Sequence, residues 1–234
     1  MLNQTELSFQ EAVPAGRRES AKRERRSRIV DAAHDLLCEV GLEALSMKQL
    51  AANSGLSLST VYNLFGSKQA VLGAVFDRDL LRYEQLVAQV RSSDALARIF
   101  DAVDVAAALY AEDPRFYRAI LWRSAGDPFL NVALREPRTR FWRRMIASAV
   151  EAGHLKPSVD SDALSALIVQ IFSGAMLDWT AGAISLEQFR KEVRFGFAVS
   201  FAAFAVQPMA TRLRAMIRDH QKRLAAPRGA GRQG

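Results

Sequence analysis

The chain has 234 residues, and half of them are hydrophobic, which allows one large or two modest domains with a substantial core. Its formal net charge is +7 at pH 7, and Cys38 is its single cysteine. A lone cysteine excludes an intrachain disulfide framework and is typical of a reducing compartment. The sequence has neither an uninterrupted apolar run of about 18 residues nor the basic start and apolar core of a signal peptide. We therefore expect a cytoplasmic protein without a membrane-spanning helix.

The positive charge is concentrated in two segments near the ends. Residues 17–28 carry a net charge of +5 and residues 210–234 a net charge of +6, so the rest of the chain is net negative. Basic segments of this kind attract a polyanion through counterion release without reading its sequence. For residues 210–234, a solubilising tail is the simpler interpretation. Residues 17–28 directly precede the motif described below, where a basic arm is well placed to follow phosphates.

In chain order, the first predicted element is a helix that follows a disordered extension. Residues 1–18 contain Pro14 and Gly16 and show no sustained periodicity, so we predict disorder there. A basic helix then begins near Glu19 and continues as an apolar helical stripe that ends at Gly41. The stripe consists of Ile29, Ala32, Ala33, Leu36, Leu37 and Val40.

Residues 46–68 predict two short helices joined by a tight turn. Ser46 is a good N-cap for the first helix and Ser57 for the second. Between them, Gly55 supplies the left-handed backbone position that a sharp reversal needs. Apolar side chains at helical spacing would bury one small seam where the helices cross, which defines a helix-turn-helix with the second helix as the reading helix. These side chains are Leu50, Ala51, Leu56, Val61 and Phe65.

A long helix is predicted next, from the N-cap Ser67 to about Arg91. Its early apolar residues, which include Val71 and Val75, would pack on the helix-turn-helix. Its later ones, which include Tyr83, are positioned to reach a second domain. One continuous helix shared by two domains would link them mechanically.

The block from Ile29 to Val75 contains the runs AAHDLL, EVGLEALSMKQLAANSGLS and TVYNLFGSK. Residue by residue, this block resembles the N-terminal domain of TetR-family transcriptional regulators. Beyond Val75 the resemblance is one of length, helicity and layout. It implies a DNA-binding domain over residues 19–75 and a helical ligand-binding and dimerisation domain over residues 76–207. Residues 208–234 then form a basic C-terminal tail.

Candidate DNA contacts come from the residues and from this resemblance. Ser46, Lys48 and Lys68 have donors suited to phosphates, and the Tyr62 hydroxyl is able to reach one. Asn63 can pair with adenine, whereas Phe65 is expected in the core. The resemblance implies that the major-groove face consists of Ser57, Leu58, Ser59, Thr60 and Asn63. A departure is Leu64, where many relatives carry a histidine, so we expect Leu64 to pack.

From Ser92 onward every segment is predicted to be helical, and we expect an all-α protein of about nine or ten helices. Pro114 and Pro128 each suit the first turn of a helix. Pro137 falls inside a helical segment, where a kink or break is expected. After Pro208, a short basic helix would precede the end of the tail.

The last two long helices, near residues 161–183 and 186–206, predict a homodimer. Each has more apolar surface than one neighbouring helix would cover. TetR-like proteins pair these helices with their symmetry mates, and a two-fold dimer predicts a near-palindromic DNA site. An intrachain core is the alternative interpretation. The residues assigned to the interface are Leu164, Leu167, Ile168, Ile171, Ala175, Phe189, Val193, Phe197, Phe201 and Phe204.

A ligand pocket is predicted among the middle helices, because their large side chains are too many for a small core without gaps. Apolar walls with a few polar groups suit a hydrophobic or aromatic small-molecule effector. The apolar candidates are Tyr110, Phe116, Tyr117, Trp122, Phe129, Trp142, Phe172, Met176 and Trp179, with Arg123, Asp178 or Arg143 as polar candidates to orient the ligand. Packed core is the alternative for each aromatic residue.

An enzyme is not expected. His34, His154 and His220 are isolated in the sequence, with no metal-ligand spacing and no partner cysteines. The sequence has neither a phosphate-binding glycine loop nor a nucleophile elbow. We therefore expect no catalytic residues, metal or cofactor. The predicted partner is double-stranded DNA, which implies association with the nucleoid, and the resemblance implies repression relieved by ligand. The alternative is a TetR-like architectural or partner-recruiting protein without small-molecule control.

Overall fold

The computed structural model describes residues 16–126 and 128–225, apart from the side chains of residues 122–135 and 223–225. Over this range the chain forms eleven helices and no strand, with one isolated bridge between Leu155 and Ala205. The all-α prediction is confirmed. The count of eleven includes a four-residue helix, Gly41–Ala44, which is too short for apolar periodicity to predict.

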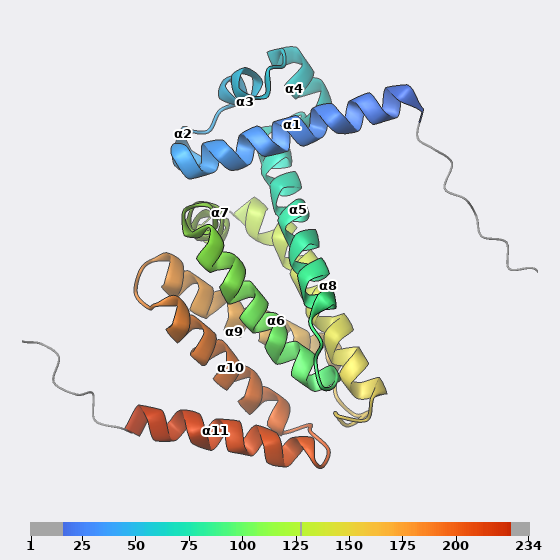
Figure 1. Cartoon of the computed structure of the whole chain (residues 1–234), viewed down its shortest axis with the longest axis vertical. Coiled ribbons are helices and arrows are strands. Elements are labelled where there is room, and N and C mark those ends of the chain that lie inside the picture. Colours follow the sequence, from blue (N-terminus) through green and yellow to red (C-terminus); the bar gives the residue numbers. More distant parts are fainter. Residues whose placement is uncertain (1–15, 127, 226–234) are drawn as a thin grey trace, which may run out of the picture.

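The N-terminal unit consists of four helices in which two short helices lie on one long one (Figure 1). The long helix begins at Arg17, near the predicted start, and ends at Glu39. Its apolar stripe is buried from Ile29 to Leu37, whereas the last predicted member, Val40, caps the helix and is 43% exposed. Its N-terminal turns extend past the rest of the unit in Figure 1. The four helices are α1 (Arg17–Glu39), α2 (Gly41–Ala44), α3 (Met47–Ser54) and α4 (Leu58–Phe65).

Two arginines of the basic segment 17–28 hold this unit together. The Arg28 Nη2 donates to the carbonyl of Ser54 at 2.5 Å, and the Arg26 Nη1 donates to the carbonyl of Leu64. The Arg26 guanidinium also lies 4.1 Å from the centre of the Phe65 ring. These contacts satisfy carbonyls at the C-terminal ends of α3 and α4, which have no partner inside their own helices. Arg26 and Arg28 therefore have a structural role in the unit. The other basic residues of α1 are exposed and lie N-terminal to them.

Helix α5 (Lys68–Gln89) joins the two parts of the molecule. It begins beside α4 and continues alongside α6 and α8, as Figure 1 shows. Ser67 caps its first turn by accepting the N–H of Ala70 at 3.2 Å. Because Val71 and Val75 are buried near α1 and Val87 is buried in the second part, the helix belongs to both cores.

Six further helices form the C-terminal part. Pro137 lies inside α8, which continues as one helix through it. Residue 127, which directly precedes the predicted helix start at Pro128, lies outside the described residues. The helices are α6 (Ala95–Glu112), α7 (Pro114–Gly126), α8 (Pro128–Glu151), α9 (Ser161–Thr180), α10 (Leu186–Ala202) and α11 (Met209–Ala225).

The predicted basic tail, residues 208–234, begins as a packed helix. In α11 the side chains of Ala210 and Leu213 are buried against α10. The Arg212 Nη1 donates to the Asp94 Oδ2 at 2.6 Å, which ties α11 to the start of α6. Residues 226–234 lie outside the described range.

Helix α9 is long and apolar enough to cross a membrane by length and composition alone. The sequence prediction of no membrane-spanning helix was based on the lack of a long uninterrupted apolar run. Polar residues interrupt α9, but its average hydropathy is still high enough for a spanning helix. It packs between α8 and α10, and 39% of its most apolar window is buried inside the structure. The core helix of a folded protein meets the same test, so the finding is weak evidence for a membrane span.

Helices α9 and α10 approach closely at Gly196, where a Cβ atom would lie 2.7 Å from the Ile171 Cγ2. We expect Gly196→Ala to destabilise the protein by about 1 kcal/mol, because overpacking outweighs the gain in helix propensity. Gly73→Ala is the matched control, since Gly73 lies in α5 with nothing within 4 Å of its added Cβ, and it should be neutral or stabilising. Urea unfolding of both variants measures the difference. Equal stability of the two would contradict the close approach.

Candidate functional site

The helix-turn-helix has the local geometry that its sequence predicts. The Ser46 Oγ accepts the N–H of Gln49 at 3.3 Å, and the Ser57 Oγ accepts the N–H of Thr60 at 3.1 Å. Gly55 has φ of 64°, the left-handed conformation that the turn requires. Both short helices therefore begin at a serine cap, and the turn between them is set by one glycine.

Helix α4 has one buried and one exposed face. Val61 and Phe65 are buried against the other helices of the unit, and Leu64 packs beside them. On the opposite face, Leu58 is 44% exposed and Tyr62 is 49% exposed. The other predicted groove-facing side chains, Ser57, Ser59 and Asn63, are exposed, and Thr60 is half-buried. A short helix thus presents hydroxyl, amide and methyl groups to solvent, which are the groups that read base edges.

The predicted phosphate contacts differ in their surroundings. Ser46 and Lys48 are exposed next to the reading helix. Lys68 is half-buried, and its Nζ donates to the carbonyl of Leu42 at 2.7 Å. Burial lowers the pKa of the Lys68 ammonium from its ordinary value. In this structure Lys68 therefore holds α2 against the start of α5.

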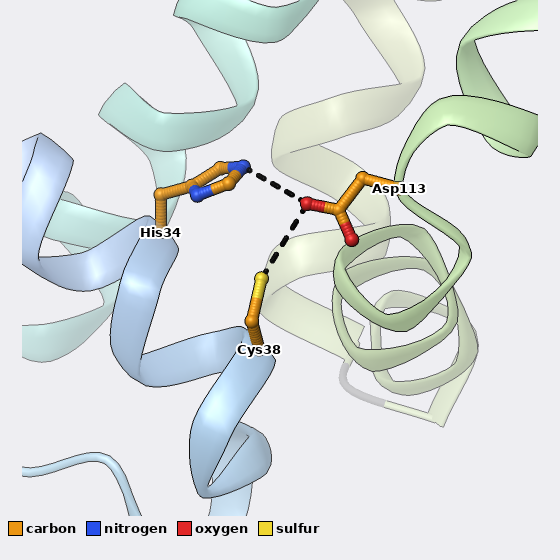
Figure 2. Close-up of side chains that lie close together, drawn as sticks. All are labelled: His34, Cys38 and Asp113. Carbon is orange, nitrogen blue, oxygen red and sulfur yellow. Dashed lines mark hydrogen bonds and ion pairs between the residues drawn. The ribbon is translucent and has the colours of Figure 1, made fainter.

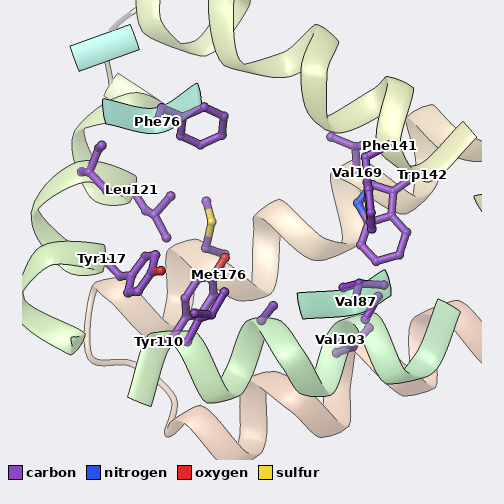
Figure 3. Packing of buried hydrophobic residues seen from close by; sticks show 14 of the residues in the cluster. Phe76, Val87, Val103, Tyr110, Tyr117, Leu121, Phe141, Trp142, Val169 and Met176 are labelled. Atoms are coloured by element: carbon purple, nitrogen blue, oxygen red, sulfur yellow. The ribbon is translucent and has the colours of Figure 1, made fainter. Parts of the chain in front are cut away.

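An internal cavity of about 60 Å³ lies between α5, α6, α7, α8 and α9. Figure 3 shows part of its wall, with Phe76, Leu121, Tyr117 and Tyr110 grouped on one side and Phe141 and Trp142 on the other. Four predicted pocket residues line this cavity: Tyr110, Tyr117, Trp142 and Phe172.

The other predicted pocket residues lie elsewhere. Phe116 lines a cleft between α1, α5 and α7, and Asp178 is exposed near the end of α9. Met176 and Trp179 are buried in the core, where Trp179 stacks on Tyr110 with ring centres 5.0 Å apart. Asp178 is therefore unavailable to orient a ligand inside the cavity. The side chains of Trp122, Arg123 and Phe129 lie outside the described residues.

Sequence reasoning missed the polar residues of the cavity, Asp79 on α5 and Arg138 on α8. The Tyr117 hydroxyl donates to the Asp79 Oδ1 at 2.7 Å, and burial raises the pKa of that carboxyl above its ordinary value. Asp79 follows Phe76 by three residues and precedes Tyr83 by four, so helical spacing places all three on one face of α5. This spacing is the feature of the sequence that could have identified Asp79 as a residue of the cavity.

Arg138 is the more unusual of the two. Its Nη2 atom is buried and has no hydrogen-bond partner among the described residues. Its guanidinium lies 4.8 Å from the centre of the Phe76 ring, and burial lowers its pKa from the ordinary value. A guanidinium nevertheless stays protonated in proteins, so the cavity contains a cationic donor that its described neighbours leave unsatisfied.

Most of the predicted dimer interface belongs to the intrachain core. Seven of its ten side chains are buried within the single chain, because the regular apolar stripes of α9 and α10 face inward. Leu167 is 43% exposed, and Ile171 and Phe204 are half-buried. Two further apolar side chains are exposed nearby: Val199 on α10 is 48% exposed, and Val206, in the segment after α10, is 38% exposed. The seven buried residues are Leu164, Ile168, Ala175, Phe189, Val193, Phe197 and Phe201.

His34 is not isolated, in contrast to the sequence prediction. It lies one turn before Cys38 on α1, and both side chains point toward Asp113, between α6 and α7 (Figure 2). The His34 Nε2 is 3.6 Å from the Asp113 Oδ2, and the Cys38 Sγ is 3.6 Å from the same oxygen. Burial and the Asp113 carboxylate raise the pKa of the Cys38 thiol to about 11, so the thiol is protonated and unsuited to act as a nucleophile.

Comparison with known proteins agrees with this geometry. Residues 29–75 match the family model for bacterial regulatory proteins of the tetR family. The HTH-type transcriptional regulator UidR of Escherichia coli (strain K12) is 23% identical over 181 residues, which span 73% of this chain and 86% of that protein. The HTH-type transcriptional repressor Rv3405c of Mycobacterium tuberculosis is 33% identical over 89 residues, or 38% of this chain and 45% of that protein.

The fold is also shared over most of the chain. A TetR transcriptional regulator from Rhodococcus sp. RHA1 has a crystal structure that matches with a TM-score of 0.64 at 19% identity, covering 77% of this chain and 97% of that one. The fold and the exposed reading helix define a helix-turn-helix DNA-binding protein. The family match identifies residues 29–75 as a TetR-type DNA-binding domain, and the chain shares the fold of TetR-family transcriptional regulators. It is a transcription factor rather than an enzyme.

Proposed function

We propose that this regulator is a homodimeric repressor that binds a near-palindromic operator and is released by a small hydrophobic or aromatic effector. The observation that carries the proposal is the exposed face of α4. Leu58, Tyr62 and Asn63 point away from the core on a helix that serine caps and arginine contacts hold in place. A helix held in this way can enter a major groove without losing its packing.

The exposed basic residues of α1 support the same surface. Arg17, Arg18, Lys22, Arg23 and Arg25 are all exposed in the N-terminal turns of α1. Contacts from such residues to phosphates add affinity that does not depend on sequence and falls as salt rises. As a DNA-binding regulator, the protein would act in the cytoplasm on the nucleoid.

Dimerisation is supported by the outward faces of α9 and α10. Leu167 on α9 and Val199 on α10 leave apolar side chains exposed there that the chain itself does not cover. A two-fold dimer through these faces would place two reading helices about one helical turn of DNA apart, ~34–36 Å or somewhat more. An inverted repeat follows from that symmetry.

Selection of bound sequences from a random duplex pool tests the DNA-binding proposal. The full-length protein is used at about physiological salt, where non-specific binding is weak. We expect an inverted repeat to be recovered. Binding without a motif, lost as salt rises, would overturn the proposal and favour an architectural role for the basic segments.

Effector control is supported by the cavity beneath α5. At about 60 Å³ the cavity is smaller than the ~150 Å³ that an apolar cavity needs to hold benzene. An aromatic effector must therefore push the surrounding helices apart. Helix α5 lines the cavity and also begins beside the reading helix. A displacement of α5 in each protomer would therefore change the distance between the two reading helices of the dimer, so that they no longer match the spacing of the operator half-sites. The alternative, a protein without small-molecule control, gives no account of a buried cation in this cavity.

The unsatisfied Arg138 narrows the effector class. A guanidinium with a free donor in an apolar cavity favours a carboxylate or another anionic group. Asp79 is already bound by Tyr117 and disfavours an acid at its end of the cavity. The effector is thus proposed to be an aromatic or aliphatic acid whose acidic group meets Arg138.

Arg138→Met should preserve operator binding but weaken release by acidic effectors about 10-fold to 100-fold, since a charged hydrogen bond contributes about 1.5–3 kcal/mol. Fluorescence anisotropy of labelled operator, titrated with substituted benzoates and the matching neutral benzamides, measures this effect. Arg140→Met is the matched control, because Arg140 is exposed on the same helix and pairs with Glu136. Equal release by acids and amides in the wild type would argue against an acidic effector.

A further inference from the structure

We propose that His34, Cys38 and Asp113 bind a divalent transition-metal ion of the zinc type at the junction of the two domains. The proposal concerns the metal alone and does not depend on the operator or on the effector. The three side chains offer one nitrogen, one sulfur and one oxygen donor, and these atoms all lie within 4.8 Å of one another. Mixed nitrogen, sulfur and carboxylate ligands are those that Zn²⁺ accepts in proteins.

The donor separations suit a tetrahedral ion. Metal–ligand bonds of about 2.0–2.3 Å at tetrahedral angles place neighbouring donors about 3.3–3.8 Å apart. The Asp113 Oδ2 is 3.6 Å from the His34 Nε2 and 3.6 Å from the Cys38 Sγ, so two of the three edges already have the required length. Figure 2 shows the two α1 side chains converging on this carboxylate from one side.

Two of the three ligands, Asp113 and His34, are held in place by contacts outside the proposed site. The Asp113 Oδ1 accepts the N–H of Phe116 at 3.0 Å as the cap of α7, which leaves Oδ2 directed toward α1. The His34 ring stacks on Phe116 with ring centres 4.3 Å apart. The His34 Nδ1 lies 3.5 Å from the Asp35 Oδ1, an arrangement in which an outer carboxylate orients a metal-binding imidazole.

The site also has an entry path and an open coordination position. His34 and Asp113 line a cleft of about 340 Å³ between α1, α5 and α7, and both side chains are about one-third exposed. The arginines of this cleft are paired, Arg78 with Asp31 and Arg82 with Glu112, so they repel a cation less than free arginines would. A water molecule or small anion from the cleft would complete the coordination, and binding releases the Cys38 thiol proton to solvent.

Such an ion would join the DNA-binding unit to the ligand domain. Two of its ligands lie on α1, whose Arg26 and Arg28 hold α3 and α4, and the third lies between α6 and α7. Binding to the folded state alone would also raise the thermal unfolding midpoint as metal concentration increases.

The test uses the full-length protein without a histidine tag, stripped with a chelator and reduced with a phosphine, and titrated with Co²⁺. We expect one equivalent to bind per chain, with a near-ultraviolet thiolate-to-metal band and the strong visible absorption of four-coordinate cobalt. Zn²⁺, the tighter binder, should then displace the cobalt. Cys38→Ser should abolish the thiolate band.

Competition with a chromophoric chelator gives the affinities of the variants. His34→Gln and Asp113→Asn should weaken Zn²⁺ binding at least 100-fold, and Asp35→Asn about 10-fold, since outer partners typically contribute 10-fold to 100-fold. His220→Gln is the matched control, because its ring stacks on Phe195 far along the chain from the site. Circular dichroism of the metal-free variants checks their folding.

Two results would overturn the proposal. One is cobalt binding without a thiolate band in the wild type. The other is unchanged zinc affinity in folded Cys38→Ser and His34→Gln, which would place any bound ion elsewhere. Neither result bears on operator recognition, so the repressor proposal would stand or fall separately.

Discussion

Asn63→Ala is expected to weaken binding to the selected operator by about 30-fold or more. A bidentate contact to a base contributes about 1–3 kcal/mol of discrimination, and in a dimer the substitution removes it from both half-sites. Asn63 is exposed on α4 and has no structural contact that its loss would disturb among the hydrogen bonds of the described residues. The effect should therefore fall on recognition rather than on stability.

Anisotropy titrations on operators changed at one base pair at a time measure this effect. In the variant, preference should disappear at one position in each half-site, while the dependence of affinity on salt stays the same. Asn53→Ala is the matched control, since Asn53 is exposed on α3 rather than on the reading helix. If Asn63→Ala keeps both affinity and base preference, α4 is not the reading helix.

Leu167→Arg is expected to convert the protein to a monomer and to weaken operator binding about 100-fold or more. Two arginines related by symmetry would enter one apolar interface, where unpaired charges are costly. In a dimer, binding of one reading helix raises the effective concentration of the second at its half-site, which increases affinity about 10²–10⁴-fold. A monomer lacks this gain. Leu167 is 43% exposed in the single chain, so the substitution leaves the fold of the protomer intact.

Sedimentation equilibrium and operator titrations together measure the result. Leu81→Arg is the matched control, because Leu81 is 55% exposed on α5 and lies outside the proposed interface. We expect Leu81→Arg to remain dimeric with unchanged operator affinity. A dimeric Leu167→Arg variant would show that the chains associate through another surface, or that the outward face of α9 has a different role.

The helix-turn-helix was predictable from sequence because its determinants are local. A serine cap, a left-handed glycine and a second serine cap lie within twelve residues, and each acts on the backbone next to it. The buried seam of Leu50, Val61 and Phe65 follows from helical spacing once those ends are set. Sequence alone therefore determined the DNA-binding unit and the all-α class.

Helices α9 and α10 show what sequence could not decide. Both are apolar on more than one side, and periodicity alone does not tell which side faces the chain's own core. The strongest stripe, which includes Phe189 and Phe197, suggested an interface, but the tertiary structure buries it. The face left for a partner carries the weaker signal of Leu167 and Val199.

Only the tertiary structure could bring together side chains that are distant in the sequence. Asp79 and Arg138 looked like ordinary helix charges until packing enclosed them in one cavity. Cys38 and Asp113 are 75 residues apart, and no spacing rule connects them. Local propensity determines where helices begin and end, because it acts between near neighbours. The cavity, the outward face and the junction between domains depend instead on which helix faces are buried together, and that is decided by the packing of the whole chain.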